Sequence, residues 1–167
     1  ERITVSKVMI AGVGMTPFGK QIGRGLRSLA TAAIDEALAD AGIPVGDIER
    51  VFFGNPAAGI VTQQEMIRGQ IALRHHALAD VPLINIENAC ASGGSALHLA
   101  FEAIAGGRAE VVLVVGAEQM NHVERSRTFD ALRGSTDIEE IGESKPDASA
   151  ANSILMDYYA GEARAGG

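Results

Sequence analysis

The sequence predicts an α/β fold in which a mainly parallel β-sheet is flanked by helices. Short continuous apolar runs recur along residues 1–120, as is typical of strands that are buried on both faces. Segments with helical spacing of apolar residues separate these runs, and glycine ends several of them. Strands that alternate with helices predict parallel pairing through helical crossovers.

The composition limits the classes of function. The chain has 167 residues, of which 47% are hydrophobic and 21% charged, as expected for a globular protein with a real core. A net charge of −7 argues against a nucleic-acid partner, which requires a basic surface. The single cysteine favours a reducing compartment. No apolar run approaches the length of a membrane span, and the first residues do not resemble a signal peptide. We therefore expect a cytoplasmic protein without a membrane partner.

The first half of the chain predicts two strands and two helices. Residues 8–14 are an apolar run followed by a turn, and we expect a buried strand there. Residues 30–41 carry apolar side chains at helical spacing, with Gly42 as the stop. Residues 51–54 predict the second strand. Residues 62–65 (TQQE) fit a capping box, which opens a helix whose apolar side holds Ile67, Ile71 and Leu78.

The second half of the chain predicts two more strands and a third helix, followed by a polar region. Residues 83–86 form the third strand and 111–115 the fourth. Between them lies a helix that ends at Gly106-Gly107, and its predicted core face is Leu97, Ala100, Phe101 and Ile104. We expect a domain over residues 1–120. Residues 121–167 then read as the start of a polar loop or lid region that is apparently truncated, with another helix beginning at 154–159.

Cys90 lies where the third strand gives way to the third helix. In open α/β sheets, ligands gather at the carboxyl ends of strands, where helix N-termini favour an anion such as a thiolate. Ser92, Gly93 and Gly94 keep the first helical turn small, so that a substrate can come close. These features suit covalent catalysis. A lone cysteine is also a common small core residue, and residue type and position leave both interpretations open.

Three sequence segments, in the expected order and at the expected separations, favour the catalytic interpretation of Cys90. The sequence of residues 88–97 (NACASGGSAL) resembles the nucleophile segment of thiolases, especially those of the sterol-carrier or lipid-transfer type. Residues 8–19 (VMIAGVGMTPFG) resemble the first strand and turn of that family, and residues 111–120, ending GAEQM, resemble its fourth strand and exit. The resemblance implies a thiolase-like fold, of which this chain is an incomplete N-terminal half.

The resemblance also implies an activity. Thiolases hold an acyl group on a cysteine as a thioester and transfer it between coenzyme A and the α-carbon of an acyl-CoA, and Cys90 matches that nucleophile. Candidate substrate-binding residues are Ser92, Gly93, Gly94, Met120 and His122. The implied substrate is acetyl-CoA or another acyl-CoA, with CoA as substrate or product and no separate cofactor or metal. A homodimer is implied as well.

The family also needs residues that this sequence lacks. Gly-His-Pro, Cys-Gly-Gly and Asn- or His-Glu-Ala-Phe segments lie in the C-terminal half of thiolases, and none occurs here. The strand that completes the family's N-terminal sheet is missing too. His98 lies about 12 Å along the helix from Cys90, and His75-His76 is expected to face solvent. His122 is therefore the only serious local candidate for a base, and we expect activity to be impaired.

Two alternatives stay open. The first is an aldolase, because some lipid-transfer-type relatives act on CoA-linked sterol side chains together with a small OB-fold protein partner. The second is a non-catalytic binding or assembly subunit with an unused cysteine.

The remaining sequence motifs are weaker. Gly12-Val-Gly14 fails the dinucleotide-binding pattern. The acidic residues at 137–143 lack metal-ligand spacing and are interpreted as surface residues. Arg125 and Arg127 could meet CoA phosphates, but a solvated loop position is preferred.

Overall fold

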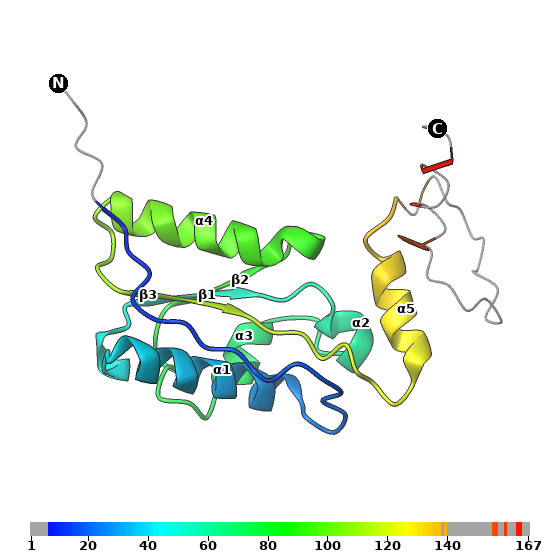
Figure 1. Cartoon of the computed structure of the whole chain (residues 1–167), viewed down its shortest axis with the longest axis horizontal. Coiled ribbons are helices and arrows are strands. Elements are labelled where there is room, and N and C mark those ends of the chain that lie inside the picture. The colour runs from blue at the N-terminus through cyan, green and yellow to red at the C-terminus, as the bar shows by residue number, and fades with distance from the viewer. Residues whose placement is uncertain (1–6, 138, 140–154, 157–158, 160–162, 165–167) are drawn as a thin grey trace.

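The protein is an α/β layer structure with a parallel three-stranded sheet, as predicted (Figure 1). The computed structural model describes residues 7–137, 139, 155–156, 159 and 163–164. The strands are β1 (Arg50–Gly54), β2 (Leu83–Ile86) and β3 (Val112–Gly116), in the order β2-β1-β3. Both pairs are parallel, with Phe52 level with Ile84 and Val114. The predicted second, third and fourth strands are thereby confirmed.

Helices cover both faces of this sheet. Helix α4 lies on one face, and α1 and α3 lie on the other (Figure 1). The helices are α1 (Leu26–Ala41), α2 (Ala58–Thr62), α3 (Arg68–Leu73), α4 (Ser92–Ala105) and α5 (Arg125–Arg133), with short 3-10 turns η1 (Val45–Asp47) and η2 (Ala89–Ala91). No helix among the residues that the structure describes is long and apolar enough to span a membrane.

The core divides into two layers because side chains alternate across the strands. Val51 and Phe53 of β1 are fully buried and point into the cluster beneath the sheet, which α1 and α3 close. Phe52, between them, points to the other face and packs beneath α4. Such burial on both faces explains why the strands read as continuous apolar runs.

Helix α1 matches the prediction for residues 30–41 and begins slightly earlier. It ends at Gly42, whose φ of 63° is in the left-handed region and whose N–H bonds to the Ala39 carbonyl. Glycine adopts that conformation without the strain that a side chain would add. The predicted end of the helix at Gly42 is therefore confirmed, and the left-handed conformation of that glycine explains it.

The predicted first strand is wrong in this structure. Residues 8–14 form no strand, and most of them are exposed. The segment instead runs against α1: the Val13 N–H bonds to the Asp40 carboxylate at 2.9 Å, and the Met15 N–H to the Glu36 carboxylate at 2.9 Å. Gly12 and Gly14 allow this, because a Cβ at either position would collide with the α1 backbone.

The predicted capping box is also wrong. Thr62 ends α2 rather than preceding a helix, and its hydroxyl donates to the Ala58 carbonyl at 2.8 Å. Helix α3 starts only at Arg68. Of its predicted apolar side, Leu78 is buried beyond the helix end, whereas Ile67 is 56% exposed. A local pattern of four residues did not determine where the helix starts.

Helix α4 has the predicted extent but buries a different face. Leu97 and Phe101 are 53% and 45% exposed, and the residues against the sheet are Ala96, Ala100 and Ala103. Of the predicted core face only Ala100 is buried, and Ile104 is half-buried. Alanine allows the helix to approach Phe52 of β1 closely. The large apolar residues are consequently left on the outside.

The polar region after residue 120 contains a helix that the sequence did not predict. Helix α5 has no buried residue, and it is joined to the rest of the molecule by polar contacts: the Thr128 hydroxyl donates to the Met120 carbonyl, and Arg127 to the Val61 carbonyl. The acidic run at 137–143 lies mostly outside the described residues. The predicted helix at 154–159 is described only at Leu155, Met156 and Tyr159, which are helical.

Gly14→Ala should destabilise the protein, because the new methyl group would meet the Ala33 carbonyl oxygen and the Ala37 nitrogen of α1. We expect a loss of about 1–3 kcal/mol in the free energy of unfolding in urea. Gly46→Ala is the matched control, since no atom lies within 4 Å of a Cβ there. Equal stability of the two variants would show that residues 8–15 do not pack on α1.

Candidate active site

Cys90 is exposed and lies at a junction between a strand and a helix. It is the central residue of η2, which follows β2 and continues directly into the 14-residue α4. Ala89 beside it has a φ of 44°, a left-handed conformation that costs a residue with a side chain about 1 kcal/mol or more. The thiol is therefore not sealed among core side chains.

Ser92 fixes the shape of this turn. It is buried, and its hydroxyl accepts a bond from the Asn88 N–H and donates one to the Ala89 carbonyl, both at 2.8 Å. The Ala91 and Ser92 N–H groups are bonded within the turn as well. Ser92 was predicted to bind substrate, and in this structure its side chain bonds to the two residues that precede Cys90 in the turn.

The three glycines near the turn have different surroundings. A Cβ on Gly54 would lie 3.3 Å from the Ser92 carbonyl, so the Cys90 turn rests on the end of β1. Gly93 and Gly94 are exposed, and nothing lies within 4 Å of a Cβ built on either. Their small size leaves the first turn of α4 open next to Cys90.

Asn55 ties the carboxyl ends of all three strands together. It directly follows β1 and is only 2% exposed. Its N–H bonds to the Ile86 carbonyl of β2 at 3.1 Å, and its Nδ2 donates to the Ala117 carbonyl after β3 at 2.6 Å. Its Oδ1 accepts from the Ala58 N–H at the start of α2. Asn55 thus joins the end of β2 through its backbone, and the segment after β3 and the start of α2 through its side chain.

Glu118 and Arg68 complete the polar cluster around Asn55. One oxygen of Glu118 accepts from the Ala57 N–H at 3.1 Å, and the other is buried without a hydrogen-bond partner among the described residues. Burial raises the pKa of the Glu118 carboxyl, against the opposing effects of the Ala57 bond and the Arg68 charge. Arg68 donates to the Asn55 carbonyl at 2.6 Å. The β1–α2 loop is held by these charged groups.

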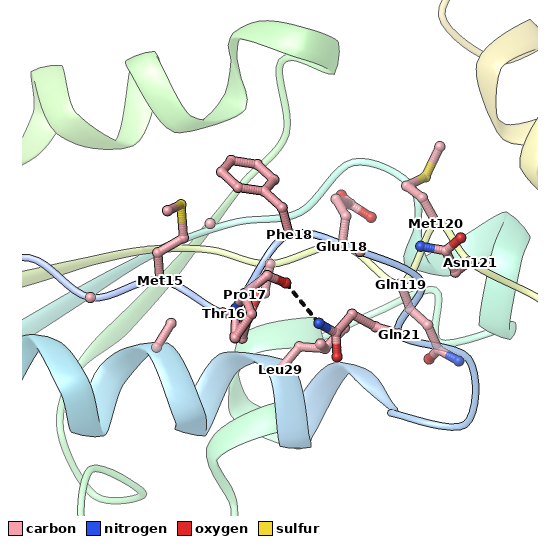
Figure 2. Close-up of a pocket in the computed structure, with 15 residues that line it drawn as sticks. Met15, Thr16, Pro17, Phe18, Gln21, Leu29, Glu118, Gln119, Met120 and Asn121 are labelled. Atoms are coloured by element: carbon pink, nitrogen blue, oxygen red, sulfur yellow. Dashed lines mark hydrogen bonds between the residues drawn. The ribbon is translucent and has the colours of Figure 1, made fainter.

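A cavity of about 280 Å³ lies beside this cluster (Figure 2). One wall comes from residues 14–19 and the other from residues 116–121, with the side chains of Met15, Phe18 and Met120 around it. Met120 is a predicted substrate-binding residue, and it lies on this cavity. Cys90 does not line it. The structure therefore does not bring Met120 and Cys90 into one pocket.

No histidine among the described residues is hydrogen-bonded to Cys90. His122 is half-buried in the loop after β3, and its Nδ1 accepts from the Glu124 N–H at 3.0 Å. His98 is exposed and pairs with Glu102 at 3.3 Å. His75 faces solvent as predicted, but His76 does not, because it is largely buried and bonds to Asp35 at 3.1 Å.

Arg125 and Arg127, interpreted from the sequence as solvated loop residues, lie on helix α5, where Arg125 is exposed and Arg127 is half-buried. Arg125 stacks over the Phe129 ring at 5.9 Å, and Arg127 bonds to the Glu124 carboxylate at 2.6 Å. That bond and the charge of Arg127 lower the pKa of Glu124. The described residues include no group of three or more His, Cys, Asp or Glu side chains that could hold a metal ion.

Sequence reasoning missed Asn55 and Glu118. Both follow strands at the carboxyl edge of the sheet, which is where ligand and catalytic residues of such sheets gather. A signal was present, because each is the first strongly polar residue after an apolar run. Only the tertiary structure shows that the two side chains belong to one cluster.

Comparison with known proteins assigns the family. The sequence model of the thiolase N-terminal domain matches residues 8–163. The chain therefore belongs to the thiolase family. The acetyl-CoA acetyltransferase of Methanocaldococcus jannaschii is 42% identical over 116 residues, covering 70% of this chain and 29% of that protein. Human sterol carrier protein 2 is 37% identical over 125 residues, covering 72% of this chain and 22% of that protein.

A solved structure supports the fold. The 3-oxoacyl-[acyl-carrier-protein] synthase III of Aquifex aeolicus superposes with a TM-score of 0.51 at 25% sequence identity, over 59% of this chain and 31% of that one. The chain thus spans less than a third of the length of each of these proteins. Its family and fold are established by these matches.

Asn55→Ala should destabilise the protein strongly, because the Ala117 carbonyl and the Ala58 N–H would lose their buried partner. We expect a loss of about 2–4 kcal/mol in the free energy of unfolding. Asn88→Ala is a suitable control, since it removes an exposed side-chain bond to Ser95. A loss below about 1 kcal/mol for Asn55→Ala would contradict the role assigned to that side chain.

Glu118→Gln should change how stability depends on pH. The carboxyl has a raised pKa in the folded state, so the unfolded chain loses this proton first and wild-type stability falls as pH rises from the ordinary to the folded pKa. Gln keeps the acceptor for the Ala57 N–H but cannot ionise. Relative to wild type, the variant should gain stability across that interval and then level off.

Urea unfolding at a series of pH values, from about 4 to 8, measures this difference. Glu49→Gln is the matched control, because Glu49 is an exposed carboxylate that also accepts one backbone bond, from the Glu110 N–H. A stability difference between Glu118→Gln and wild type that stays constant with pH would contradict the buried position of Glu118.

Proposed function

We propose that the protein acts in acyl transfer of the thiolase kind, with Cys90 as the residue that accepts the acyl group from acetyl-CoA or another acyl-CoA. The observation that carries this proposal is the exposed thiol at the junction of η2 and α4. Membership of the thiolase family and similarity to proteins named acetyl-CoA acetyltransferase support it.

The proposed chemistry is a thioester exchange. Cys90 loses its proton, and the thiolate sulfur attacks the carbonyl carbon of the acyl-CoA. The tetrahedral intermediate collapses with cleavage of the bond to the CoA sulfur, which leaves as a thiolate and takes up a proton. The acyl group remains on Cys90 as a new thioester. The positive end of the α4 dipole favours the attacking thiolate.

The surroundings of Cys90 support the first half of a thiolase reaction better than the second. Gly93 and Gly94 leave space for a bulky thioester beside the sulfur. Within the described residues, however, His76, His98 and His122 bond to groups other than Cys90. We therefore propose that this chain alone is acylated slowly and that carbon–carbon bond formation or cleavage needs groups beyond those described.

Acylation of Cys90 is measured by mass spectrometry after incubation with acetyl-CoA. We expect wild type to gain one acetyl group, located on Cys90, and Cys90→Ala to gain none. The double variant Cys90→Ala/His98→Cys is the matched control, because it moves the thiol to an exposed position on the same helix. It should react with iodoacetamide but accept acetyl at least about tenfold more slowly.

A second candidate is a non-catalytic binding or assembly subunit of the same family. The absence of a histidine bonded to Cys90 among the described residues favours it. Equal acetylation of the wild type and the Cys90→Ala/His98→Cys variant, or none in either, would support this candidate and overturn acyl transfer. The third possibility, an aldolase acting on CoA-linked sterol side chains with an OB-fold partner, would be supported by retention of substrate without an acyl-cysteine.

A further inference from the structure

Ala89, the residue before Cys90, has a backbone conformation that side chains disfavour. Its φ is 44°, in the left-handed region, where the Cβ of any residue other than glycine crowds the backbone. Ala89 and Cys90 share a peptide bond, so a rotation about the Ala89 backbone turns the Cys90 peptide and redirects its thiol. Surrounding contacts must hold such a conformation in place.

Two side chains hold Ala89, one at each of its backbone polar groups. A carboxylate oxygen of Glu87 accepts a bond from the Ala89 N–H at 2.7 Å. The Ala89 carbonyl accepts a bond from the Ser92 hydroxyl at 2.8 Å and another from the Ser92 N–H. The left-handed residue is therefore fixed between Glu87 on one side and Ser92 on the other.

Glu87 and Ser92 differ in what else depends on them. Ser92 is 4% exposed and also bonds to the Asn88 N–H, so its replacement would disturb the start of α4 as a whole. Glu87 is exposed, and its side chain bonds to Ala89. A bond of 2.7 Å from an N–H to a carboxylate is a strong one, because the acceptor carries a charge. Glu87 thus acts on the conformation of Ala89 without being part of the core.

We propose that Glu87 is a positioning residue for Cys90: by bonding to the Ala89 N–H, it holds the left-handed turn that directs the thiol outward. This inference rests on the proposed function of Cys90 as the acyl acceptor. In this role Glu87 needs no contact with the acyl-CoA and takes no proton in the thioester exchange. It keeps the sulfur in the orientation from which it attacks, and such orientation contributes a large share of many catalysed rates.

The charge of Glu87 has the opposite effect to its hydrogen bond. Glu87 precedes Cys90 by three residues, and a carboxylate there opposes the negative charge that forms on the sulfur and then on the carbonyl oxygen during attack. If charge alone mattered, removal of Glu87 would speed acylation. The contacts of Ala89 predict the reverse, so the sign of the effect separates the two roles.

The rate of Cys90 acetylation by acetyl-CoA, followed by mass spectrometry, measures this sign. Glu87→Ala should slow acetylation by about tenfold or more, because the turn is released. Glu87→Gln keeps an acceptor for the Ala89 N–H without the charge, so its rate should stay within about threefold of wild type. Glu102→Ala is the matched control, because it removes an exposed carboxylate of α4 that pairs with His98. Its rate should equal that of wild type.

Ala89→Gly tests whether Glu87 acts through Ala89. Glycine adopts a φ of 44° without strain, so the turn no longer needs the Glu87 bond to the same degree. In the Ala89→Gly background, Glu87→Ala should therefore slow acetylation by no more than about threefold. A role of Glu87 in general stability alone would give the same loss of rate in both backgrounds, which would contradict positioning through Ala89.

Nuclear Overhauser measurements give a second readout that does not depend on acyl transfer. A left-handed residue brings its own N–H and Hα close together, so Ala89 should give a strong signal between these protons in wild type and Glu87→Gln. The signal should weaken in Glu87→Ala. A wild type that is not acetylated would overturn the proposed function, and this signal would still test the contact with Ala89. An unchanged signal in Glu87→Ala, or an acetylation rate at or above that of wild type, would overturn the positioning role.

Discussion

The bonds of Asn55 at the carboxyl ends of β1, β2 and β3 are the interaction on which the rest of the site depends. Parallel strands end at one edge, but their backbones provide no bonds beyond their last residues, so the loops that follow need another anchor. The buried Asn55 side chain supplies it by reaching from the end of β1 to Ala117 and Ala58. Asn55 thereby links the segment after β3, which includes Glu118, to the start of α2. Its backbone N–H links both to the end of β2, which precedes the Cys90 turn.

Close packing of small residues gives the site its position over the sheet. Gly54 lets the Cys90 turn rest on β1, and Ala96 and Ala100 let α4 lie directly on Phe52. The helix therefore starts close above the strand ends, with its positive end at the thiol. The same arrangement leaves Leu97 and Phe101 on the outer side of α4. Helix α4 thus lies close to the sheet through its alanines, and its largest apolar side chains stay exposed.

The described chain presents an exposed thiol at Cys90 without a histidine bonded to it. Cys90 is held by Ser92 and opened by Gly93 and Gly94, whereas the histidines bond elsewhere.

The sequence by itself determined the fold class, three strands, α1 and α4, and the place of Cys90. These depend on local causes: continuous apolar runs, 3.6-residue spacing, and glycine in the left-handed stop at Gly42. The likeness of residues 88–97 to a nucleophile segment added the family. Each of these signals is contained within a short stretch of chain, so each could be read without the structure.

Only the tertiary structure decided which groups meet. The face that α4 buries is set by how closely a helix can approach Phe52, and periodicity alone favoured the larger residues Leu97 and Phe101. Residues 8–14 read as a strand, but a strand exists only where a neighbour bonds to it, and Gly12 and Gly14 place this segment on α1. Asn55 and Glu118 are 63 residues apart in the chain, and parallel pairing of β1 with β3 brings them together.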